Sequence, residues 1–135
     1  MVIAWLGGLV LSGRATAEAM EAKRVKSKVF AIPGSDIKQL VRAMGAAYAT
    51  DRIMVEGQRI GYMYREVPHK PPDSGWRFFA GDEDEKYLGD PGHTGVYAVN
   101  TVANYDPDII PYLDTAAPCA FDKVPGTKRC EPVKS

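Results

Sequence analysis

Residues Gly75–Glu85 have the sequence GWRFFAGDEDE, and this stretch decides the fold. Its first half is rich in aromatic residues, which favours a strand. Trp76 and Phe78 point to one side of such a strand and Phe79 to the other, so a central, buried position in a sheet is expected. Four consecutive carboxylates, residues 82–85, follow at once. The stretch therefore predicts a buried strand that runs into an acidic edge.

A second stretch, residues 100–109 with the sequence NTVANYDPDI, adds an Asn- and Asp-rich turn to this edge. Residues 82–114 carry eight carboxylates and one lysine, a formal charge of −7, whereas seven basic and three acidic residues give residues 14–42 a charge of +4. This split predicts an acidic face that attracts a basic partner and repels nucleic acid. The alternative is an ordinary solvated surface.

The chain has 135 residues, 45% hydrophobic and 25% charged, with a net charge of zero. These values are typical of one soluble globular domain. We expect residues 1–29 to be a leader or linker and residues 30–135 to form the folded domain.

The N-terminus leaves the location open. Residues 2–11 are an apolar run, and Ala15-Thr16-Ala17 has the form that a signal peptidase accepts. No Lys or Arg precedes the run, which favours a cytoplasmic protein over an exported or periplasmic one with a signal peptide at residues 1–17. A start at Met20 is a third alternative. The run is too short for a stable membrane span, which needs about 20 apolar residues.

A helix is expected from Ser35 to Met44. Ser35 can cap it, Gly45 can end it, and four apolar residues recur at i, i+3, i+4 and i+7: Ile37, Leu40, Val41 and Met44. The fold class predicted is α+β, a mostly antiparallel β-sheet with this one packed N-terminal helix and short helical turns. Strands are expected at 48–55 and 59–66, joined as a hairpin, and at 75–80 and 94–100, with helical turns at 82–88 and 106–113 and a terminal hairpin around Pro125-Gly126.

Catalytic chemistry is not indicated. His69 and His93 lie in Pro- and Gly-rich loops away from any nucleophile signature. Residues 82–85 lack the alternating ligands of a calcium loop, and no phosphate-binding glycine loop is present. We therefore expect no catalytic residue, no metal and no cofactor.

Arg77 allows two interpretations. It can form a half-buried bidentate ion pair with a carboxylate of the acidic block or with Asp106, or it can contact a partner directly. An exposed Tyr beside carboxylates suits an interface, although Asn side chains at turns commonly bond their own backbone. The candidate partner-binding residues are Trp76, Arg77, Asp82, Glu83, Asp84, Asn104, Tyr105, Asp106 and Asp108.

Cys119 and Cys130 flank the predicted terminal hairpin, which would bring their thiols opposite each other. In an oxidising compartment they are expected to form a disulfide, and in the cytosol to stay reduced.

Four ordered segments carry a resemblance to a known family: ATDRI at 49–53, GYMYRE at 61–66, DSGWRFFAGDED at 73–84 and NTVANYDPDI at 100–109. From about Phe30 to Val133 the chain resembles a bacterial domain family, long of unknown function, that is described as a predicted immunity protein of polymorphic toxin systems. The resemblance implies a mostly β domain, encoded beside a toxin, that neutralises this toxin by direct binding. It supplies no catalytic residues. The leader at residues 1–17, Ala98 and the two cysteines depart from the family pattern.

Two functions from different classes follow. The first is a toxin-neutralising immunity protein that binds its cognate toxin, a nuclease or another enzyme with a basic cleft, through an acidic surface. The second is a housekeeping adaptor or regulatory binding module with no toxin partner. An enzyme would require a pocket that gathers two titratable groups around Arg77.

Overall fold

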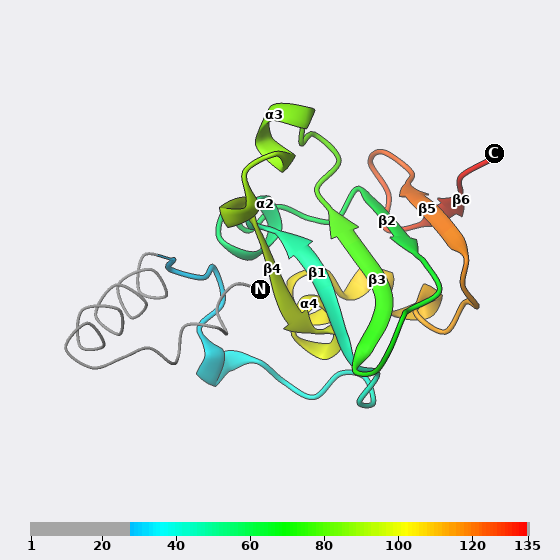
Figure 1. Ribbon diagram of the computed structural model, residues 1–135, viewed down its shortest axis with the longest axis horizontal. Helices are drawn as coiled ribbons and strands as arrows, with labels where there is room; N and C mark the ends of the chain where they lie inside the picture. Colours follow the sequence, from blue (N-terminus) through cyan, green and yellow to red (C-terminus); the bar gives the residue numbers. More distant parts are fainter. Residues whose placement is uncertain (1–27, 135) are drawn as a thin grey trace. The chain divides into compact units, whose positions relative to one another are not determined.

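The computed structural model describes residues 28–134 (Figure 1). The chain divides into two units, residues 1–30 and 31–135, and all the strands and helices of the described residues lie in the second. The predicted leader at residues 1–17 and the alternative start at Met20 lie outside the described residues. Within the described part of the chain, no helix is both long enough and apolar enough to cross a bilayer.

Six strands form one sheet in the order β4-β1-β3-β2-β5-β6 (Figure 1). The neighbours β1 and β3 are parallel, and the other neighbouring pairs are antiparallel. The sheet is therefore mixed. The strands are β1 (Ala46–Thr50), β2 (Tyr62–Arg65), β3 (Asp73–Phe79), β4 (Thr94–Ala98), β5 (Cys119–Lys123) and β6 (Cys130–Pro132).

The predicted hairpin between strands 48–55 and 59–66 is wrong, because β3 lies between β1 and β2. A short helix, α2 (Asp51–Met54), follows β1 directly. Gly57 ends this helix at φ +78°, and the Gly57 and Gln58 N–H groups bond back to the Ile53 and Arg52 carbonyls. This is the hydrogen-bond pattern of a helix C-terminus closed by a left-handed glycine. Gly57 therefore ends a helix and does not turn a hairpin.

The predicted N-terminal helix over Ser35–Met44 is also wrong. Between residue 28, where the described part of the chain begins, and β1, the structure has one 3-10 turn, η2 (Gly34–Asp36), and no other helix. The backbone of residues 38–41 bonds instead to two asparagine side chains, Asn100 and Asn104. These long-range bonds replace the i to i−4 bonds that a helix would make.

The remaining helical segments are short. Strand β4 ends two residues earlier than expected, and an unpredicted helix follows it directly. The predicted hairpin around Pro125-Gly126 is confirmed as β5 and β6. The short helical segments that follow α2 are α3 (Glu85–Leu88), η3 (Pro91–His93), α4 (Val99–Tyr105) and η4 (Pro107–Tyr112).

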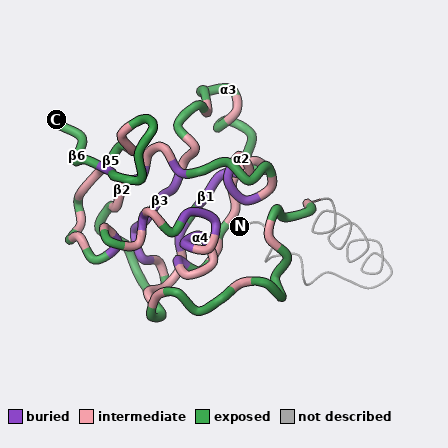
Figure 2. The backbone as a smooth tube through the Cα atoms, turned by 180° about the vertical axis from the view of Figure 1, so that it is seen from behind, coloured by how far each residue is buried: buried purple, intermediate pink, exposed green. Residues whose placement is uncertain are grey.

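The two faces of the sheet differ. Helix α4 lies over one face (Figure 2) and buries the core against it. We call this the covered face; its strand residues are Ala47, Ala49, Met63, Trp76, Phe78 and Phe121. By strand alternation the opposite side chains lie on the other face, which we call the open face. Its residues are Tyr48, Tyr62, Tyr64, Arg77, Phe79 and Val96.

Candidate functional site

The acidic block at residues 82–85 lies between β3 and α3, and local contacts use much of it. Glu83 accepts hydrogen bonds from the Thr50 hydroxyl at 2.5 Å and from the Ala80 and Gly81 N–H groups at 2.8 Å. Burial alone would raise the pKa of Glu83, but these donors outweigh it and the pKa is lowered. Glu83 therefore ties the end of β3 to β1.

Two other carboxylates of the block also have structural contacts. Asp84 is the N-cap residue of α3, and its side chain accepts the Tyr87 N–H at 2.7 Å. Asp82 lies 3.2 Å from the Arg52 Nε, yet more than half of its side chain is exposed. Asp82 is thus both held in place and accessible to a partner.

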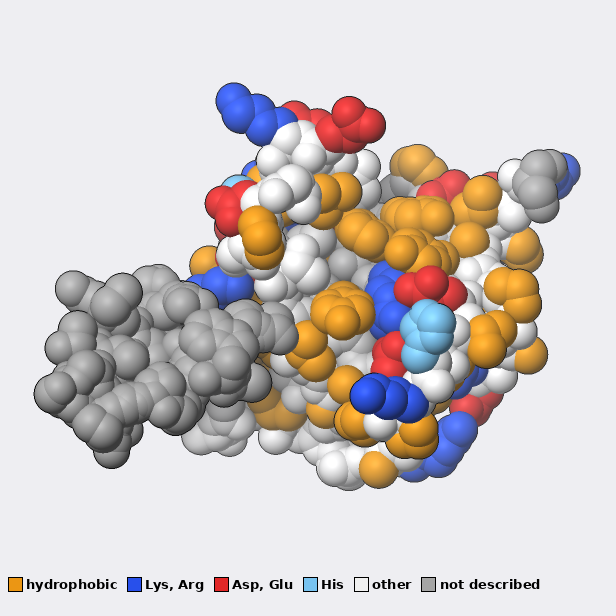
Figure 3. Space-filling view, viewed as in Figure 1, with side chains coloured by type: hydrophobic (Ala, Val, Ile, Leu, Met, Phe, Trp, Pro, Cys, Tyr) orange, Lys and Arg blue, Asp and Glu red, His pale blue; other side chains and the backbone are white. Residues whose placement is uncertain are grey.

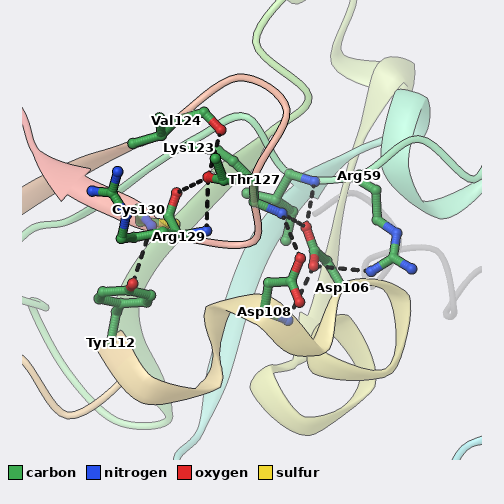
Figure 4. Close-up of polar contacts among 10 residues, drawn as sticks. Arg59, Asp106, Asp108, Tyr112, Lys123, Val124, Thr127, Arg129 and Cys130 are labelled. Atoms are coloured by element: carbon green, nitrogen blue, oxygen red, sulfur yellow. Dashed lines mark hydrogen bonds and ion pairs between the residues drawn. The ribbon is translucent and has the colours of Figure 1, made fainter.

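Asp106 is fully buried and does not lie on a surface (Figure 4). It accepts hydrogen bonds from the Arg59 guanidinium at 3.1 Å, the Ile60 N–H at 3.0 Å and the Lys123 ammonium. Burial acts to raise its pKa, but the Lys123 and backbone donors prevail and lower it. Asp108 shares Lys123 at 3.3 Å. This cluster joins η4 to β5 and belongs to the scaffold.

Three other predicted partner-binding residues are also structural. Trp76 is fully buried and donates its indole N–H to the Leu113 carbonyl at 3.1 Å. The Tyr105 hydroxyl bonds the Ile32 backbone, and the Asn104 amide bonds the Lys38 backbone. The structure therefore does not gather the nine predicted residues into one surface.

Arg77 occupies the centre of the open face. Its guanidinium makes a bidentate pair with Asp73, at 2.9 Å for both bonds, and donates through Nε to Glu66 at 2.8 Å. The Arg77 bond chiefly accounts for the lowering of the Asp73 pKa to about 2. The predicted bidentate geometry is confirmed, but the predicted partners, the acidic block and Asp106, are wrong.

A β-bulge explains this pairing. The β1–β3 register shifts between Ala46, opposite Asp73, and Tyr48, opposite Arg77. Gly75 lies inside the bulge at φ +90°, and a Cβ there would come within 2.1 Å of the Glu66 carbonyl oxygen. Glycine is therefore required at this point. In a regular strand, residues four apart are separated by about 13 Å, so the bend helps Arg77 reach Asp73.

Aromatic rings surround this ion cluster. The Tyr48 ring lies 4.6 Å below the Arg77 guanidinium, and Tyr64 stacks on Phe79 with centroids 5.9 Å apart. Tyr62 contacts both of these rings. Figure 3 shows this side, where hydrophobic side chains gather over the central strands with charged groups among them.

Two shallow hollows flank the aromatic rings, and Phe79 and Leu88 line both. The smaller, of about 280 Å³, contains Arg77 with Tyr48 and Tyr64, and no Asp, Glu, His or Cys is among its lining residues. The larger, of about 590 Å³, includes Asp82, Glu83 and Asp122. The titratable groups that line the Arg77 hollow are the phenols of Tyr48 and Tyr64 and the Arg77 guanidinium itself. Among residues 28–134, no three His, Cys, Asp or Glu side chains are placed to hold a metal ion.

The open face was missed as a site by sequence reasoning. The alternation of Tyr62 and Tyr64 in β2 was the available signal, but the wrongly predicted helix was expected to cover one face of this sheet. Asp73 lies outside the predicted strand 75–80, although β3 begins at this residue.

The cysteines are free thiols in the structure. The β5–β6 register places Cys130 opposite Lys123, four residues from Cys119 and thus about 13 Å along the strand. The expectation that the hairpin brings the two thiols opposite each other is therefore wrong.

Comparison with known proteins gives one match. No curated protein and no solved structure matches the chain. A family model described as the immunity protein Imm33 domain matches residues 47–133, a range that contains all six strands except the first residue of β1. The chain therefore belongs to the Imm33 family of immunity proteins.

Proposed function

We propose that this protein neutralises a toxin by binding it directly, without chemical change to either molecule. The family match carries the proposal, since it covers nearly the whole sheet. Two observations favour binding: the charge of Arg77 is neutralised by Asp73 and Glu66, and no carboxylate, imidazole or thiol lines the hollow beside it.

The proposal includes an acidic surface that has fewer carboxylates than the sequence predicted. Asp106 and Glu83 have internal partners, whereas Asp82, Asp84 and Glu85 keep accessible side chains on the segment that leads into α3. Such carboxylates would attract a toxin with a basic cleft, for example a nuclease, and would speed its association.

The test is to produce the chain together with the product of the adjacent reading frame. We expect the two proteins to purify as one complex and cells to survive expression of that product only when this chain is present. The control is Trp76→Ala, which should destabilise the fold and weaken both effects. Survival without any complex, or no rescue at all, would contradict neutralisation by binding.

A further inference from the structure

We propose that the open face is the surface that contacts the toxin, and that the contacting segment carries an apolar side chain next to Lys or Arg. This proposal rests on the proposed function and adds the surface and the chemistry of the partner.

Apolar exposure is the first argument. Tyr48 and Val96, which are paired in neighbouring strands, are 44% and 50% exposed, and Leu88 on α3 is 39% exposed. Tyr48 and Leu88 line one hollow together with the partly buried rings of Tyr64 and Phe79, and Tyr62 contacts both of these rings. Contiguous apolar patches mark interaction sites, and Tyr and Arg are enriched at the centre of interfaces.

Rigidity is the second argument. The Arg77 guanidinium is fixed by bonds to Asp73, Glu66 and the Trp76 carbonyl, and its stacking on Tyr48 orders that ring. The Tyr64 and Phe79 rings are stacked as well. A partner would therefore meet side chains that are already ordered, which reduces the entropy lost on binding.

The third argument is the charge of the open face, which indicates the kind of partner that fits it. Strand register places Asp122 and Glu131 on the same face as Tyr62, and Asp82 lines the larger hollow. Arg77 adds no net positive charge to this face, because Asp73 and Glu66 together outweigh it. Aromatic rings beside the carboxylates of Asp82, Asp122 and Glu131 fit a segment that inserts an apolar side chain between the rings and brings Lys or Arg to these carboxylates.

The chain offers a matched pair of leucines for the test. Leu88 lines both hollows of the open face, whereas Leu40, with a similar exposure of 41%, lies on the segment that is bonded to α4 on the covered side. Binding of the purified product of the adjacent reading frame is measured for the full chain and for each variant. We expect Leu88→Ser to raise the Kd at least about tenfold and Leu40→Ser to leave it within about twofold. Val96 lies on strand β4 and Leu88 on helix α3, so Val96→Ser is an independent test of the same face and should raise the Kd as Leu88→Ser does. Circular dichroism checks that each variant is folded.

A second pair tests the charge. Asp122→Lys on the open face and Asp36→Lys on η2 change the net charge equally. We expect the first to slow association several-fold at low salt, with the effect decreasing as salt is added, and the second to have little effect.

The outcomes separate the two proposals. If the unaltered chain binds and Leu88→Ser, Val96→Ser and Leu40→Ser bind equally well, the surface is wrong and the proposed function stands. If the unaltered chain does not bind, both fail. If the chain alone forms a dimer that Leu88→Ser dissociates, a second copy covers the open face and the surface proposal is overturned.

Discussion

The covered and open faces of one sheet carry similar numbers of aromatic rings but use them differently. On the covered face Trp76 and Phe78 stack and are fully buried beneath α4 and η4. On the open face Tyr48 and Tyr64 lie beside an ion cluster and remain partly accessible. Side chains of the covered face are therefore used in packing, whereas several rings of the open face remain partly accessible, as the proposed toxin contact requires.

The largest effect is expected on the covered face. Trp76→Ala should lower the free energy of unfolding by about 3–5 kcal/mol, because it leaves a large cavity and frees the Leu113 carbonyl. Tyr48→Ala is the control on the open face and should cost less than about 1 kcal/mol. Urea denaturation measures both. Equal losses would remove the distinction between the faces.

The Asp106 cluster should have an effect of similar size. Asp106→Ala leaves the nearly buried Lys123 ammonium without its closest carboxylate and is expected to cost about 3–5 kcal/mol. Asp108→Ala removes a longer contact to the same lysine and should cost about 1 kcal/mol. If Asp106→Ala retained stability but lost toxin binding, Asp106 would be a recognition residue after all.

A smaller effect is expected where α4 holds the N-terminal segment. The Asn100 Oδ1 accepts the Leu40 and Val41 N–H groups, at 2.7 and 3.0 Å, so Asn100→Ala should cost about 1–3 kcal/mol. Amide hydrogen exchange should become faster at Leu40 and Val41. Asn104→Ala, in contrast, should speed exchange at Lys38, whose N–H bonds the Asn104 Oδ1. Unchanged exchange in both variants would show that other contacts hold this segment.

This segment also shows where sequence reasoning reached its limit. The spacing of the four apolar residues predicted that they contact the core. Ile37, Val41 and Met44 do pack against it, whereas Leu40 is exposed and the helical conformation is wrong. The bonds that decide the conformation come from asparagines about 60 residues away, and local periodicity contains no such information. The same holds for Gly57, because a glycine can turn a hairpin or end a helix.

Local patterns succeeded where the determinants are local. The aromatic run of β3 predicted a central strand, and Asp84 and Asp106 cap the helical segments that follow them. The buried state of Asp106 depends on Lys123 from a distant strand, and the Arg77 site depends on Glu66 from a neighbouring strand and on a bulge. Sequence alone therefore predicted the chemistry of Arg77 but not its partners.

The smallest effect is a pH dependence from the open face. The pKa of Asp73 is about 2 in the folded chain and 3.8 in the reference state, so its ionised form stabilises the fold above about pH 4, and this contribution is lost as the pH falls towards 2. Because the side chain is partly exposed, we expect about 1 kcal/mol. Urea denaturation between pH 5 and pH 2.5 measures this. At pH 5 the free energy of unfolding should be lower for Asp73→Asn than for the unaltered chain, and this difference should become smaller as the pH is lowered. Asp36→Asn, which removes an exposed carboxylate of η2, is the control: its free energy of unfolding should change with pH as that of the unaltered chain does. A constant deficit for Asp73→Asn at every pH would mean that the Arg77 pair does not depend on the charge of Asp73, and that the open face is held by packing in the same way as the covered face.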